Sequence, residues 1–411
     1  MPLDHLPART PVSPEVLRIV DAMVDSVRHY TNARSLPSAA YTSQEFYEFE
    51  KEAIFMKSWL AVGHHNQIPN AGDYFTVEIA DEPLIVVRQK DMSIKVLSAI
   101  CQHRGHPLVF NCEEEKTGNC AAFTCPYHSW TYDINGSLRG APEMGKTIPI
   151  AQQRQDTKLP ELKVELFHGF IFANFDPDAA PLAPTMAKAD AELRNYHFED
   201  MVVQPTQVFL NNPWNWKITL ENGLEPYHTD YVHRGIHEGA PAANARFSDF
   251  EDWKEGDNYV THITYFEGKT PNAAINPLGK IIFPALKDLT EEERSRVVFS
   301  AAPPTLFFCL LADQAFTFRV FPRAANRMDL FVNFFYPKET TRLRNFQWMR
   351  QMQVATTGAF GEQDDLTNKT MQKAFKSRFA PRGRYSHLEA ILPEFNRWLY
   401  QNYQRYIAQQ R

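Results

Sequence analysis

Apolar residues recur at helical spacing near the start of the chain. They do so over residues 14–32, where Ser13 is a candidate N-cap and Pro14 falls in the first turn. A second stretch with the same spacing covers residues 43–59. We expect two helices here, before the pattern changes to that of β-strands.

Short β-branched runs separated by turn residues follow the predicted helices. Asn135-Gly136 stands between strand-like flanks, which is a strong hairpin signal. The region from about residue 56 to 175 therefore predicts a compact all-β domain. Its clearest predicted strands lie at residues 74–79, 83–88, 93–100 and 169–175.

A Pro-rich stretch at residues 176–184 predicts a domain boundary, and a mixed pattern follows it. Helical spacing occurs at residues 185–196, from 216 through 233, at 339–377 and at 388–401. Strands are predicted at 305–311, 315–322 and 328–336, and the last two could pair as a hairpin.

These elements predict an α+β protein in which an all-β domain is inserted near the N-terminus of a second domain. The inserted domain covers residues 56–176. The second domain has an N-terminal helical part at residues 1–55 and a main part at residues 185–411, which we expect to contain an antiparallel sheet.

Composition narrows the classes of protein and of partner. The 411 residues suffice for two domains, and 44% apolar with 22% charged residues is ordinary for a globular protein. A net charge of −6 argues against a nucleic-acid or anionic-membrane partner. The longest apolar run, residues 306–312, is too short to cross a bilayer. We see no signal peptide and no disulfide framework among the five cysteines, so we expect a cytoplasmic protein.

The first metal-ligand motif combines Cys101 and His103 with Cys125 and His128, in a C-x-H and a C-x-x-H pattern. Two thiolates and two imidazoles suit a Rieske [2Fe–2S] cluster, where both histidines bind one iron. A zinc site in a binding protein is the alternative. Zinc fingers usually group Cys with Cys and His with His, whereas each half here contributes one of each. The pattern therefore favours the cluster.

The second motif places Glu225, His228 and His233 within nine residues. Two histidines that need one more carboxylate suit a mononuclear Fe(II) that activates O₂. On an ideal α-helix His228 and His233 would be separated by about 140°, so they can share a metal only if the helix is broken or bulged. Two unrelated helix histidines are the alternative. The acids at Asp364 and Asp365 offer a third ligand, although clustered acids are usually a solvated face.

With both motifs, the chain resembles the catalytic α subunits of the Rieske non-haem iron oxygenases, which act on aromatic rings or quaternary amines. Further resemblance runs through residues 41–50, 58–59, 72–74 and 215–217. The step from Gln363-Asp364 to Gln372 implies that Asp364 is the third iron ligand, with Asp365 as the fallback. The implied fold is an all-β Rieske [2Fe–2S] domain inserted into an α+β, helix-grip-like catalytic domain.

The resemblance also implies a function. Such a terminal oxygenase uses O₂ and electrons from NAD(P)H, delivered by a separate flavin and iron–sulfur reductase and in some systems a ferredoxin. Glu225 would bridge a Rieske histidine of one subunit to an iron histidine of the next, so a homotrimer is expected, with or without a β subunit. The chain has no G-x-G-x-x-G after a strand with which to bind the nucleotide itself. A pure electron carrier is the alternative, against which the complete iron triad argues.

The resemblance implies that the substrate is a small organic molecule that is hydroxylated or oxidatively demethylated. A methylated or quaternary amine is favoured slightly, because Glu225 stands where many ring-hydroxylating members have Asp. An aromatic acid or arene, attacked by a mono- or dioxygenase, is the alternative. We expect residues 239–289 to contribute loops over the pocket. Four aromatic residues there could form a cage for an ammonium group or could be ordinary core residues: Trp253, Tyr259, Tyr265 and Phe266.

The spacer between the two halves of the first motif departs from the family pattern. It holds 21 residues, 104 to 124, a few more than is usual in the family. We expect the extra segment around Cys112 and Cys120 to lengthen a surface loop. Free thiols are the expected state of both cysteines.

Overall fold

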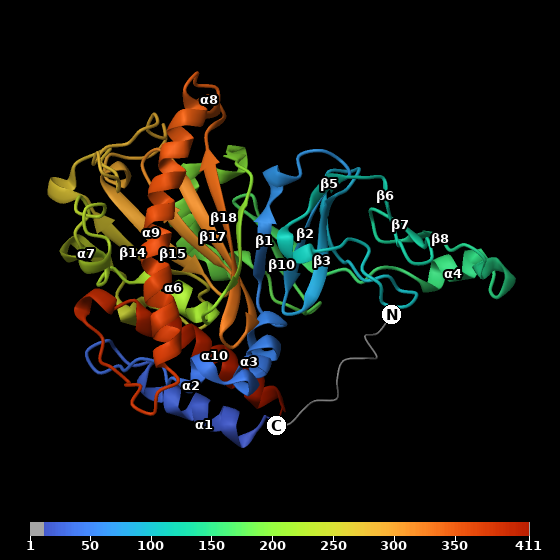
Figure 1. The fold of residues 1–411 in the computed structure, drawn as a ribbon, viewed down its shortest axis with the longest axis horizontal. Helices are drawn as coiled ribbons and strands as arrows, with labels where there is room; N and C mark the ends of the chain where they lie inside the picture. Colours follow the sequence, from blue (N-terminus) through green and yellow to red (C-terminus); the bar gives the residue numbers. More distant parts are fainter. Residues whose placement is uncertain (1–11, 411) are drawn as a thin grey trace. The chain divides into compact units, whose positions relative to one another are not determined.

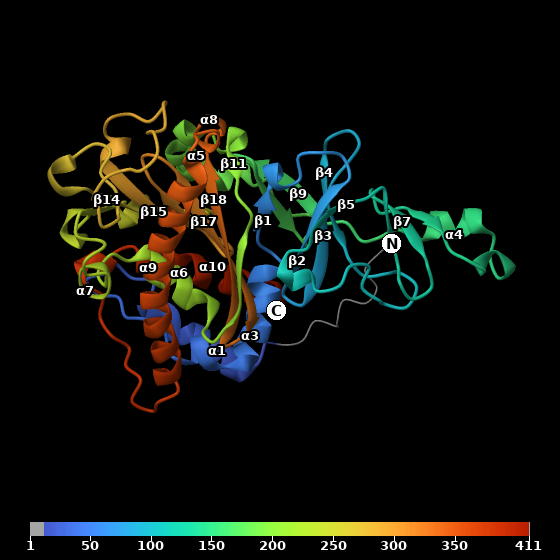
Figure 2. The same ribbon diagram turned by 45° about the horizontal axis from the view of Figure 1, so that its top comes forward.

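The computed structural model describes residues 12–410, which divide into two compact units. One, the β unit, comprises residues 55–180. The other, the α+β unit, comprises residues 12–54 and 181–410. Figures 1 and 2 trace the elements of both. No helix within residues 12–410 has the length and apolar character needed to cross a membrane. The predicted α+β class with an inserted β domain is confirmed.

The β unit consists of three small antiparallel sheets. The four-stranded sheet has the order β4 (Ile94–Ser98), β3 (Glu82–Arg88), β2 (Asp73–Ile79) and β5 (Thr117–Asn119). The second has the order β1 (Leu60–His64), β10 (Phe170–Asn174) and β9 (Lys163–Phe167). The third has the order β6 (Ala122–Thr124), β7 (Thr131–Asp133) and β8 (Leu138–Gly140) and is followed by helix α4 (Ile150–Asp156).

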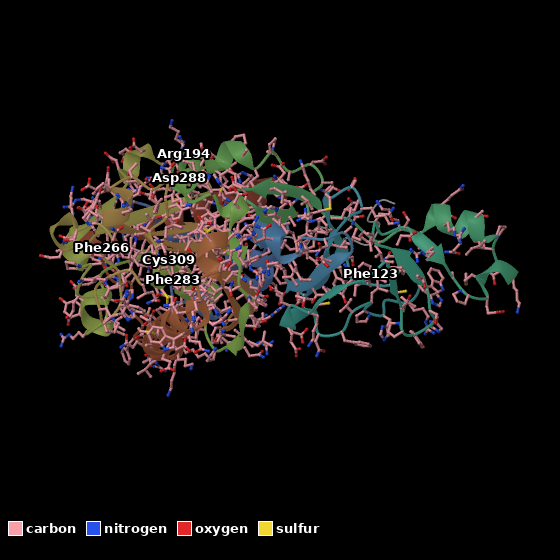
Figure 3. All side chains as sticks on the ribbon, turned by 90° about the horizontal axis from the view of Figure 1, so that it is seen from above. Phe123, Arg194, Phe266, Phe283, Asp288 and Cys309 are labelled. Carbon is pink, nitrogen blue, oxygen red and sulfur yellow. The ribbon has the colours of Figure 1, made fainter. Side chains whose placement is uncertain are left out.

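The predicted hairpin at Asn135-Gly136 is confirmed between β7 and β8. Gly136 has a φ of +87°, which favours glycine, and its backbone N–H donates to the carbonyl of Asp133. Apolar residues of this sheet and of the four-stranded sheet share one core cluster, in which Phe123 (Figure 3) is buried. The turn therefore fixes the register of a sheet that carries half of the first motif.

The spacer between the two halves of that motif is not only a surface loop, which corrects the expectation. Cys112 begins a 3-10 turn (Cys112–Glu114) and is 3% exposed, and its carbonyl accepts a hydrogen bond from Thr76 Oγ1 at 3.2 Å. Strand β5 follows and pairs with β2. The added residues are held by an apolar core contact and an edge strand. Both cysteines are free thiols, as expected, and burial raises the pKa of Cys112 to about 11.

An eight-stranded antiparallel sheet forms the centre of the α+β unit. Its main path runs through β11 (Val202–Val203), β18 (Arg327–Tyr336), β17 (Ala315–Ala324), β16 (Leu306–Leu310), β15 (Arg296–Ala302), β14 (Val260–Tyr265) and β13 (Ala245–Phe247), and β12 (Gln207–Asn212) also pairs with β18. The predicted hairpin of β17 and β18 is confirmed over its whole length. Phe283 and Phe346 pack in one buried cluster with Tyr336 at the end of β18. Figure 3 labels Phe283, and also Cys309 on β16.

The helices of the α+β unit come from both ends of the chain. They are α1 (Pro14–Ala22), α2 (Ala39–Thr42), α3 (Gln44–Glu50), α5 (Ala187–Leu193), α6 (Trp216–Leu224), α7 (Thr229–Val232), α8 (Lys338–Thr341), α9 (Phe346–Ala374) and α10 (Leu392–Gln410). Helix α6 packs against β14, β15 and β17 and against α9, which crosses the sheet in Figures 1 and 2. A sheet covered by these two helices is the frame of the second motif.

Three predicted helices are shorter in the structure. The first ends after α1 and a 3-10 turn (Met23–Asp25), because the hydroxyl of Ser26 donates to the carbonyl of Ser35 and ties the chain into a loop. The second passes from α3 into a π-helical turn (Lys51–Phe55) and stops before Trp59. The third is split into α8 and α9. Apolar spacing continued past the end of the second helix because the segment that follows also buries an apolar residue, Trp59.

Residues 239–289, which were expected to contribute loops, also contain two strands of the large sheet. They include β13 and β14, and β14 is an inner strand of the large sheet. The strand alternates between buried and half-buried residues, but two of its three buried residues are His262 and Thr264. Because these are polar, the alternation of hydrophobicity that predicts a strand is masked.

Candidate metal centres

Two loops of the β unit position the first motif. Cys101 follows β4, and its loop is closed by hydrogen bonds from Cys101 N to the carbonyl of His106 (2.9 Å) and from Gly105 N to the carbonyl of Cys101 (3.0 Å). Gly105 has a φ of +73°, which a tight turn needs and glycine allows. The short β6–β7 hairpin carries the other half.

In this second loop, Cys125 N donates to the carbonyl of Trp130 (2.8 Å) and Ser129 N to the carbonyl of Cys125 (2.9 Å). Ser129 has a φ of +56° in the left-handed region, where a non-glycine residue needs support from its surroundings. The two hydrogen bonds supply it. They fix Cys125 and His128 on the same small loop.

The four side chains of the motif converge. The imidazole rings of His103 and His128 lie 4.7 Å apart, and the ring of Trp130 stacks on His103 at 4.7 Å. Both rings are half-buried, but each Nδ1 atom is buried and has no hydrogen-bond partner within residues 12–410. Buried polar atoms without partners are rare, so these two nitrogens are candidate metal ligands.

The thiols of Cys101 and Cys125 are buried on the same site. Two sulfurs and two orphaned Nδ1 atoms are the donor set of a Rieske [2Fe–2S] cluster, and the residues present fit that group. With Nδ1 directed inward, the exposed part of each imidazole lies on the far side of the ring. Cys101, His103, Cys125 and His128 would hold the cluster.

Tyr132 is a member of this site that the sequence reasoning missed. Its hydroxyl accepts a hydrogen bond from Gln102 N (3.0 Å) and lies 3.5 Å from the Sγ of Cys101. Burial raises the pKa of Tyr132, so the phenol keeps its proton. Because its acceptor side is occupied by Gln102, that proton is free to point to the sulfur. Hydrogen bonds to the sulfurs are one of the ways a protein sets the potential of such a cluster.

The second motif lies where helix α6 ends. Asn215 caps the start of α6 by accepting a hydrogen bond from Lys217 N at 3.0 Å. Glu225, at the other end, has an extended backbone, and Pro226 follows it, so the helix stops and the short α7 begins after His228. His228 and His233 flank α7. A broken helix is one of the two arrangements that the spacing of these histidines required.

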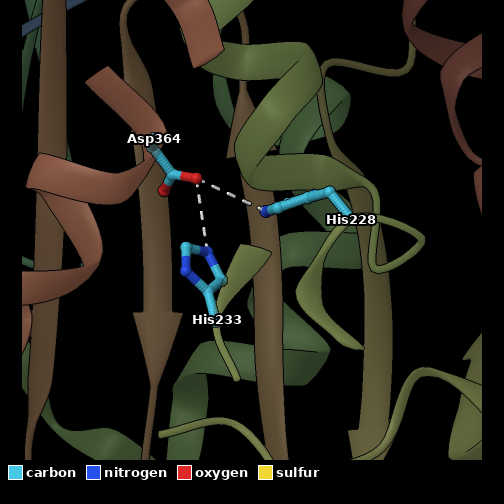
Figure 4. A group of neighbouring side chains, drawn as sticks. All are labelled: His228, His233 and Asp364. Atoms are coloured by element: carbon cyan, nitrogen blue, oxygen red, sulfur yellow. Dashed lines mark ion pairs between the residues drawn. The ribbon is translucent and has the colours of Figure 1, made fainter. Parts of the chain in front are cut away.

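Figure 4 shows that His228, His233 and Asp364 point toward one another. Their ligand atoms all lie within 4.8 Å of each other, in a group that could hold a metal ion. Asp364 Oδ1 lies 3.6 Å from His228 Nε2 and 3.3 Å from His233 Nε2. Asp364 comes from α9, whereas His228 and His233 follow the end of α6, so the packing of α6 against α9 brings the three ligands together. Asp365, the fallback, instead lies 4.0 Å from Lys369 Nζ.

The Nδ1 atoms of His228 and His233 make hydrogen bonds within the protein. Glu225 accepts from His228 Nδ1 at 2.6 Å, and Gln363 Oε1 from His233 Nδ1 at 2.8 Å. Each Nδ1 therefore carries the proton in the neutral ring, and each Nε2 keeps its lone pair toward Asp364. The sequence predicted Glu225 as a neighbour of the site but missed Gln363, because its partner His233 is 130 positions away.

Charge around His228 favours a positive charge at Nε2, which a bound metal ion would supply in place of a proton. Burial opposes a charge on the ring, but Glu225 and Asp364 outweigh it and raise the pKa of His228. Asn222 Nδ2 donates to Asp364 Oδ1 at 3.3 Å and thereby orients the carboxylate. Two imidazole nitrogens and one carboxylate oxygen on one side of a site are the donor set of a mononuclear non-haem Fe(II), and the residues present fit that ion.

Two further histidines lie beside this centre and were not predicted. His237 is 4% exposed and His262 1% exposed. Burial lowers the pKa of His237 to about 4 and that of His262 to about 3. Both rings are therefore neutral at pH 7.

Two rings of the possible aromatic cage lie against cationic side chains of the protein. Strand alternation directs Tyr265 to the face of β14 opposite His262, and Lys269 Nζ lies 4.5 Å from its ring centre. Trp253 instead lies against Arg397, whose Cζ is 5.6 Å from the ring centre. Each ring already contacts a cationic side chain.

Comparisons with known proteins agree with both centres. The family model for the ring hydroxylating alpha subunit (catalytic domain) matches residues 190–405, and the model for the Rieske [2Fe-2S] domain matches residues 58–161. The chain belongs to the Rieske ring-hydroxylating oxygenase alpha subunits. Its cofactors are those of the family, a Rieske [2Fe–2S] cluster and a mononuclear iron, and its enzyme class is that of the Rieske non-haem iron oxygenases.

Relatives of this Rieske oxygenase chain fall into two groups. The oxygenase subunit of carnitine monooxygenase from Acinetobacter pittii is 30% identical over 228 residues, 54% of this chain and 58% of the relative. The alpha subunit of benzene 1,2-dioxygenase from Pseudomonas putida is 35% identical over 200 residues, 47% of this chain and 42% of the relative. The chain thus matches about half the length of these curated relatives.

Solved structures show the same division. A quaternary ammonium Rieske monooxygenase in complex with L-carnitine has a TM-score of 0.74 at 22% identity, covering 94% of this chain and 99% of that one. Naphthalene 1,2-dioxygenase from Rhodococcus sp. bound to indole has a TM-score of 0.77 at 19% identity, covering 95% and 99%. At these identities the likeness shows the fold alone.

Proposed function

We propose that this chain is the terminal oxygenase of a multicomponent Rieske system, which oxidises a small organic substrate with O₂. The observation that carries the proposal is the convergence of His228, His233 and Asp364 with both Nε2 atoms turned inward. When bound, the cluster supplies electrons one at a time and the Fe(II) supplies O₂ activation. The residues of the chain hold, orient and shield these groups.

The electron source is a separate protein in this proposal. A reductase would take electrons from NAD(P)H through flavin and iron–sulfur centres, directly or through a ferredoxin, and reduce the cluster held by the β unit. The half-exposed rings of His103 and His128 support this entry point, because their outer sides can meet a partner while their Nδ1 atoms face inward. We further propose a homotrimer, with a β subunit compatible with the same arrangement.

Glu225 has a positioning role in this proposal. It accepts hydrogen bonds from both Nδ1 and the backbone N–H of His228, at 2.6 and 3.1 Å. A carboxylate that holds a ligand histidine on one side is suited to couple it to the Rieske histidine of a neighbouring subunit. Relatives that act on carnitine, and others that act on benzene, support two substrate classes: methylated amines and arenes.

The test of the reaction class is substrate-stimulated O₂ consumption with a compatible reductase, with formaldehyde assayed in the same vessel. O₂ uptake matched by formaldehyde would establish a demethylase. Uptake with an arene and no formaldehyde would establish ring hydroxylation. A protein that binds both metals but consumes no O₂ with any substrate, once its cluster is reduced, would contradict the proposal.

The test of Glu225 is the variant Glu225→Gln. We expect it to keep both metals and to slow transfer of electrons from the reduced cluster to the iron centre, measured by stopped-flow reoxidation of the cluster in single turnover. The exposed Glu251→Gln is the control and should leave that rate unchanged. A normal rate in Glu225→Gln would remove Glu225 from the coupling role.

A further inference from the structure

Helix α9 carries the iron ligand Asp364, yet few of its residues are fully buried. Of its 29 residues, the buried ones are Phe346, Gln353, Asn368 and Gln372, and three of these four side chains are amides. The apolar one, Phe346, begins the helix, and Asp364 lies about 27 Å further along it at 1.5 Å per residue. Full apolar burial therefore anchors α9 only at the end remote from the iron site.

Gln372 anchors the other end of α9. Its Oε1 accepts a hydrogen bond from the backbone N–H of Asn215 at 2.9 Å, and its Nε2 donates to the backbone carbonyl of Tyr41 at 3.0 Å. These three residues, which we call the amide clamp, are at most 3% exposed. Loss of the Gln372 amide would leave two buried backbone groups without partners, which costs more free energy than the hydrogen bonds contribute.

The two partners of Gln372 are themselves held by other elements. The hydroxyl of Tyr41 donates to Glu221 on α6 at 2.7 Å, and its ring stacks on that of Phe375, directly after α9, at 4.5 Å. Asn215 caps α6 and donates from Nδ2 to the carbonyl of Ala325 at 2.7 Å, in the turn between β17 and β18. The amide clamp is therefore joined to α2, to α6 and to the large sheet.

A second hydrogen bond joins α6 and α9 at the iron site, where Asn222 Nδ2 donates to Asp364 Oδ1 at 3.3 Å. At 1.5 Å per residue, Asn222 lies about 10.5 Å from Asn215 along α6, and Asp364 lies about 12 Å from Gln372 along α9. Residue numbers rise along one helix as they fall along the other, so the two helices are antiparallel. One register of α9 against α6 satisfies both contacts.

The position of Asp364 depends on this register. A slip of α9 by one residue would move Asp364 by about 1.5 Å along the helix axis and turn it by about 100°. Its Oδ1 lies 3.3 Å from His233 Nε2 and 3.6 Å from His228 Nε2 (Figure 4), so such a slip would separate the ligand atoms. A buried amide resists a slip that apolar contacts tolerate, and one such side chain can specify the register of packed helices.

We infer that Gln372 is a positioning residue for the iron site, because it sets the register of α9 and thereby places the Asp364 carboxylate against His228 and His233. It acts through the helix, since its own hydrogen bonds go to Asn215 and Tyr41. The amide clamp contains no metal ligand, so it places Asp364 before iron binds. This inference deepens the proposed function and rests on its iron site.

The test measures iron binding rather than turnover. Wild-type protein and the variant Gln372→Met, each with its cluster in place, are freed of mononuclear iron and titrated with Fe(II) against a metal-sensitive chelator. Met has nearly the length of Gln but cannot replace its amide donor and acceptor. We expect Gln372→Met to lower the Fe(II) affinity about tenfold, the lower end of the range for groups outside the ligand set.

Gln353→Met is the matched control. Gln353 lies on the same helix and is 6% exposed, but it belongs to the part of α9 that precedes the iron site. Its substitution should leave the Fe(II) affinity unchanged. Denaturant unfolding of the metal-free proteins compares the stability of the two variants. Gln372→Glu keeps an acceptor for the N–H of Asn215 and should retain part of the affinity.

A spectroscopic measurement separates a change of position from a loss of stability. The nitric oxide complex of the bound Fe(II) gives an electron paramagnetic resonance signal whose shape reports the arrangement of the ligands. We expect this signal to differ from that of the wild type in Gln372→Met. In Gln353→Met it should be the signal of the wild type.

Three outcomes would overturn the inference. These are wild-type Fe(II) affinity in Gln372→Met, an equal loss of affinity in Gln353→Met, and a loss of affinity in Gln372→Met with an unaltered signal. Failure of the proposed oxygenase function would be seen separately, as a wild-type protein that binds Fe(II) and has a reduced cluster but consumes no O₂ with any substrate.

Discussion

The β unit and the α+β unit each bring two histidines to a metal centre, yet the protein engages opposite nitrogens of the rings. In the β unit, Nδ1 of His103 and of His128 is buried and unpartnered. In the α+β unit, Nδ1 of His228 and of His233 is held by Glu225 and Gln363, and Nε2 faces the site. The same side chain thus serves two arrangements, which differ in what surrounds the ring.

This difference follows from the elements that carry the ligands. Short loops of the β unit reach over the cluster site from its edge, so the backbone comes close and the outer side of each ring stays accessible. In the α+β unit, Glu225 at the end of α6 and Gln363 on α9 instead hold His228 and His233 by the ring nitrogen that faces away from the site. An accessible ring suits electron entry, whereas a ring held on its far side suits a fixed coordination geometry.

The largest expected effect comes from removing one histidine of either pair. His228→Ala should abolish turnover and mononuclear iron binding while the Rieske absorption and electron paramagnetic resonance spectra stay intact. His128→Ala should have the opposite effect on the two metals. The cluster spectrum should be lost, and Fe(II) should remain at the other site. Loss of both metals in either variant would show that the two units do not hold their metals independently.

The second test separates the two neighbouring acids of α9. Asp364→Asn should lower turnover by more than about 100-fold, beyond the roughly 10–100-fold effect of groups outside the ligand set, because it removes a ligand. Asp365→Asn should change turnover little, since Asp365 lies 4.0 Å from Lys369 Nζ and outside the triad. The check is iron content and O₂ uptake. Equal losses in the two variants would contradict the assignment of Asp364, rather than Asp365, as the third iron ligand.

The third test concerns the group that holds His233 from behind. Gln363→Leu should lower Fe(II) affinity by roughly 10–100-fold, because His233 loses the acceptor that fixes its ring and tautomer. Gln363→Glu keeps an acceptor and should retain most of the affinity. The exposed neighbour Glu362→Leu is the control. Competition with a metal-sensitive chelator measures the affinity, and an unaltered value in Gln363→Leu would show that α9 positions His233 by packing alone.

The motifs of both centres could be predicted because each is local. Cys101 with His103, Cys125 with His128, and His228 with His233 are pairs within a few residues, so their spacing alone limits the metal they suit. Asp364 came from the family resemblance, because no local pattern distinguishes it from Asp365. The fold class followed from the change between helical and strand-like spacing.

The supporting residues could not be predicted, because their partners are far away in the sequence or their signals are weak. Gln363 meets His233 only because α9 crosses the sheet beside α7. Tyr132 reaches Cys101 across two loops. His262 lies on a strand in which two of the three buried residues are polar, so a pattern of hydrophobic residues does not reveal it. Such positions depend on tertiary packing, which a single sequence does not encode by spacing.

The smallest expected effect is on the pH dependence of stability. It concerns a buried carboxyl group of the α+β unit. Glu221 on α6 is largely buried, and this burial raises its pKa to about 7 despite a hydrogen bond from Tyr41 and the nearby Lys217. The folded state therefore binds a proton more tightly than the unfolded chain, whose carboxyl has an ordinary pKa of about 4.5. Glu221 thus favours folding fully below about pH 4.5, and this contribution is lost as the pH rises to about 7.

Glu221→Gln should remove this dependence. Between pH 5.5 and 8 the free energy of unfolding of the wild type should fall by about 2 kcal/mol more than that of the variant, at about 1.4 kcal/mol for each unit up to the folded pKa. Denaturant unfolding of both proteins at the two pH values measures the difference. The half-buried Glu113→Gln, in the β unit, should show no such difference. Parallel curves for Glu221→Gln and the wild type would mean that Tyr41 and Lys217 keep Glu221 ionised. In that case the α+β unit would hold buried charge at no pH-dependent cost, and the contrast between the two units would rest on the geometry of their histidines alone.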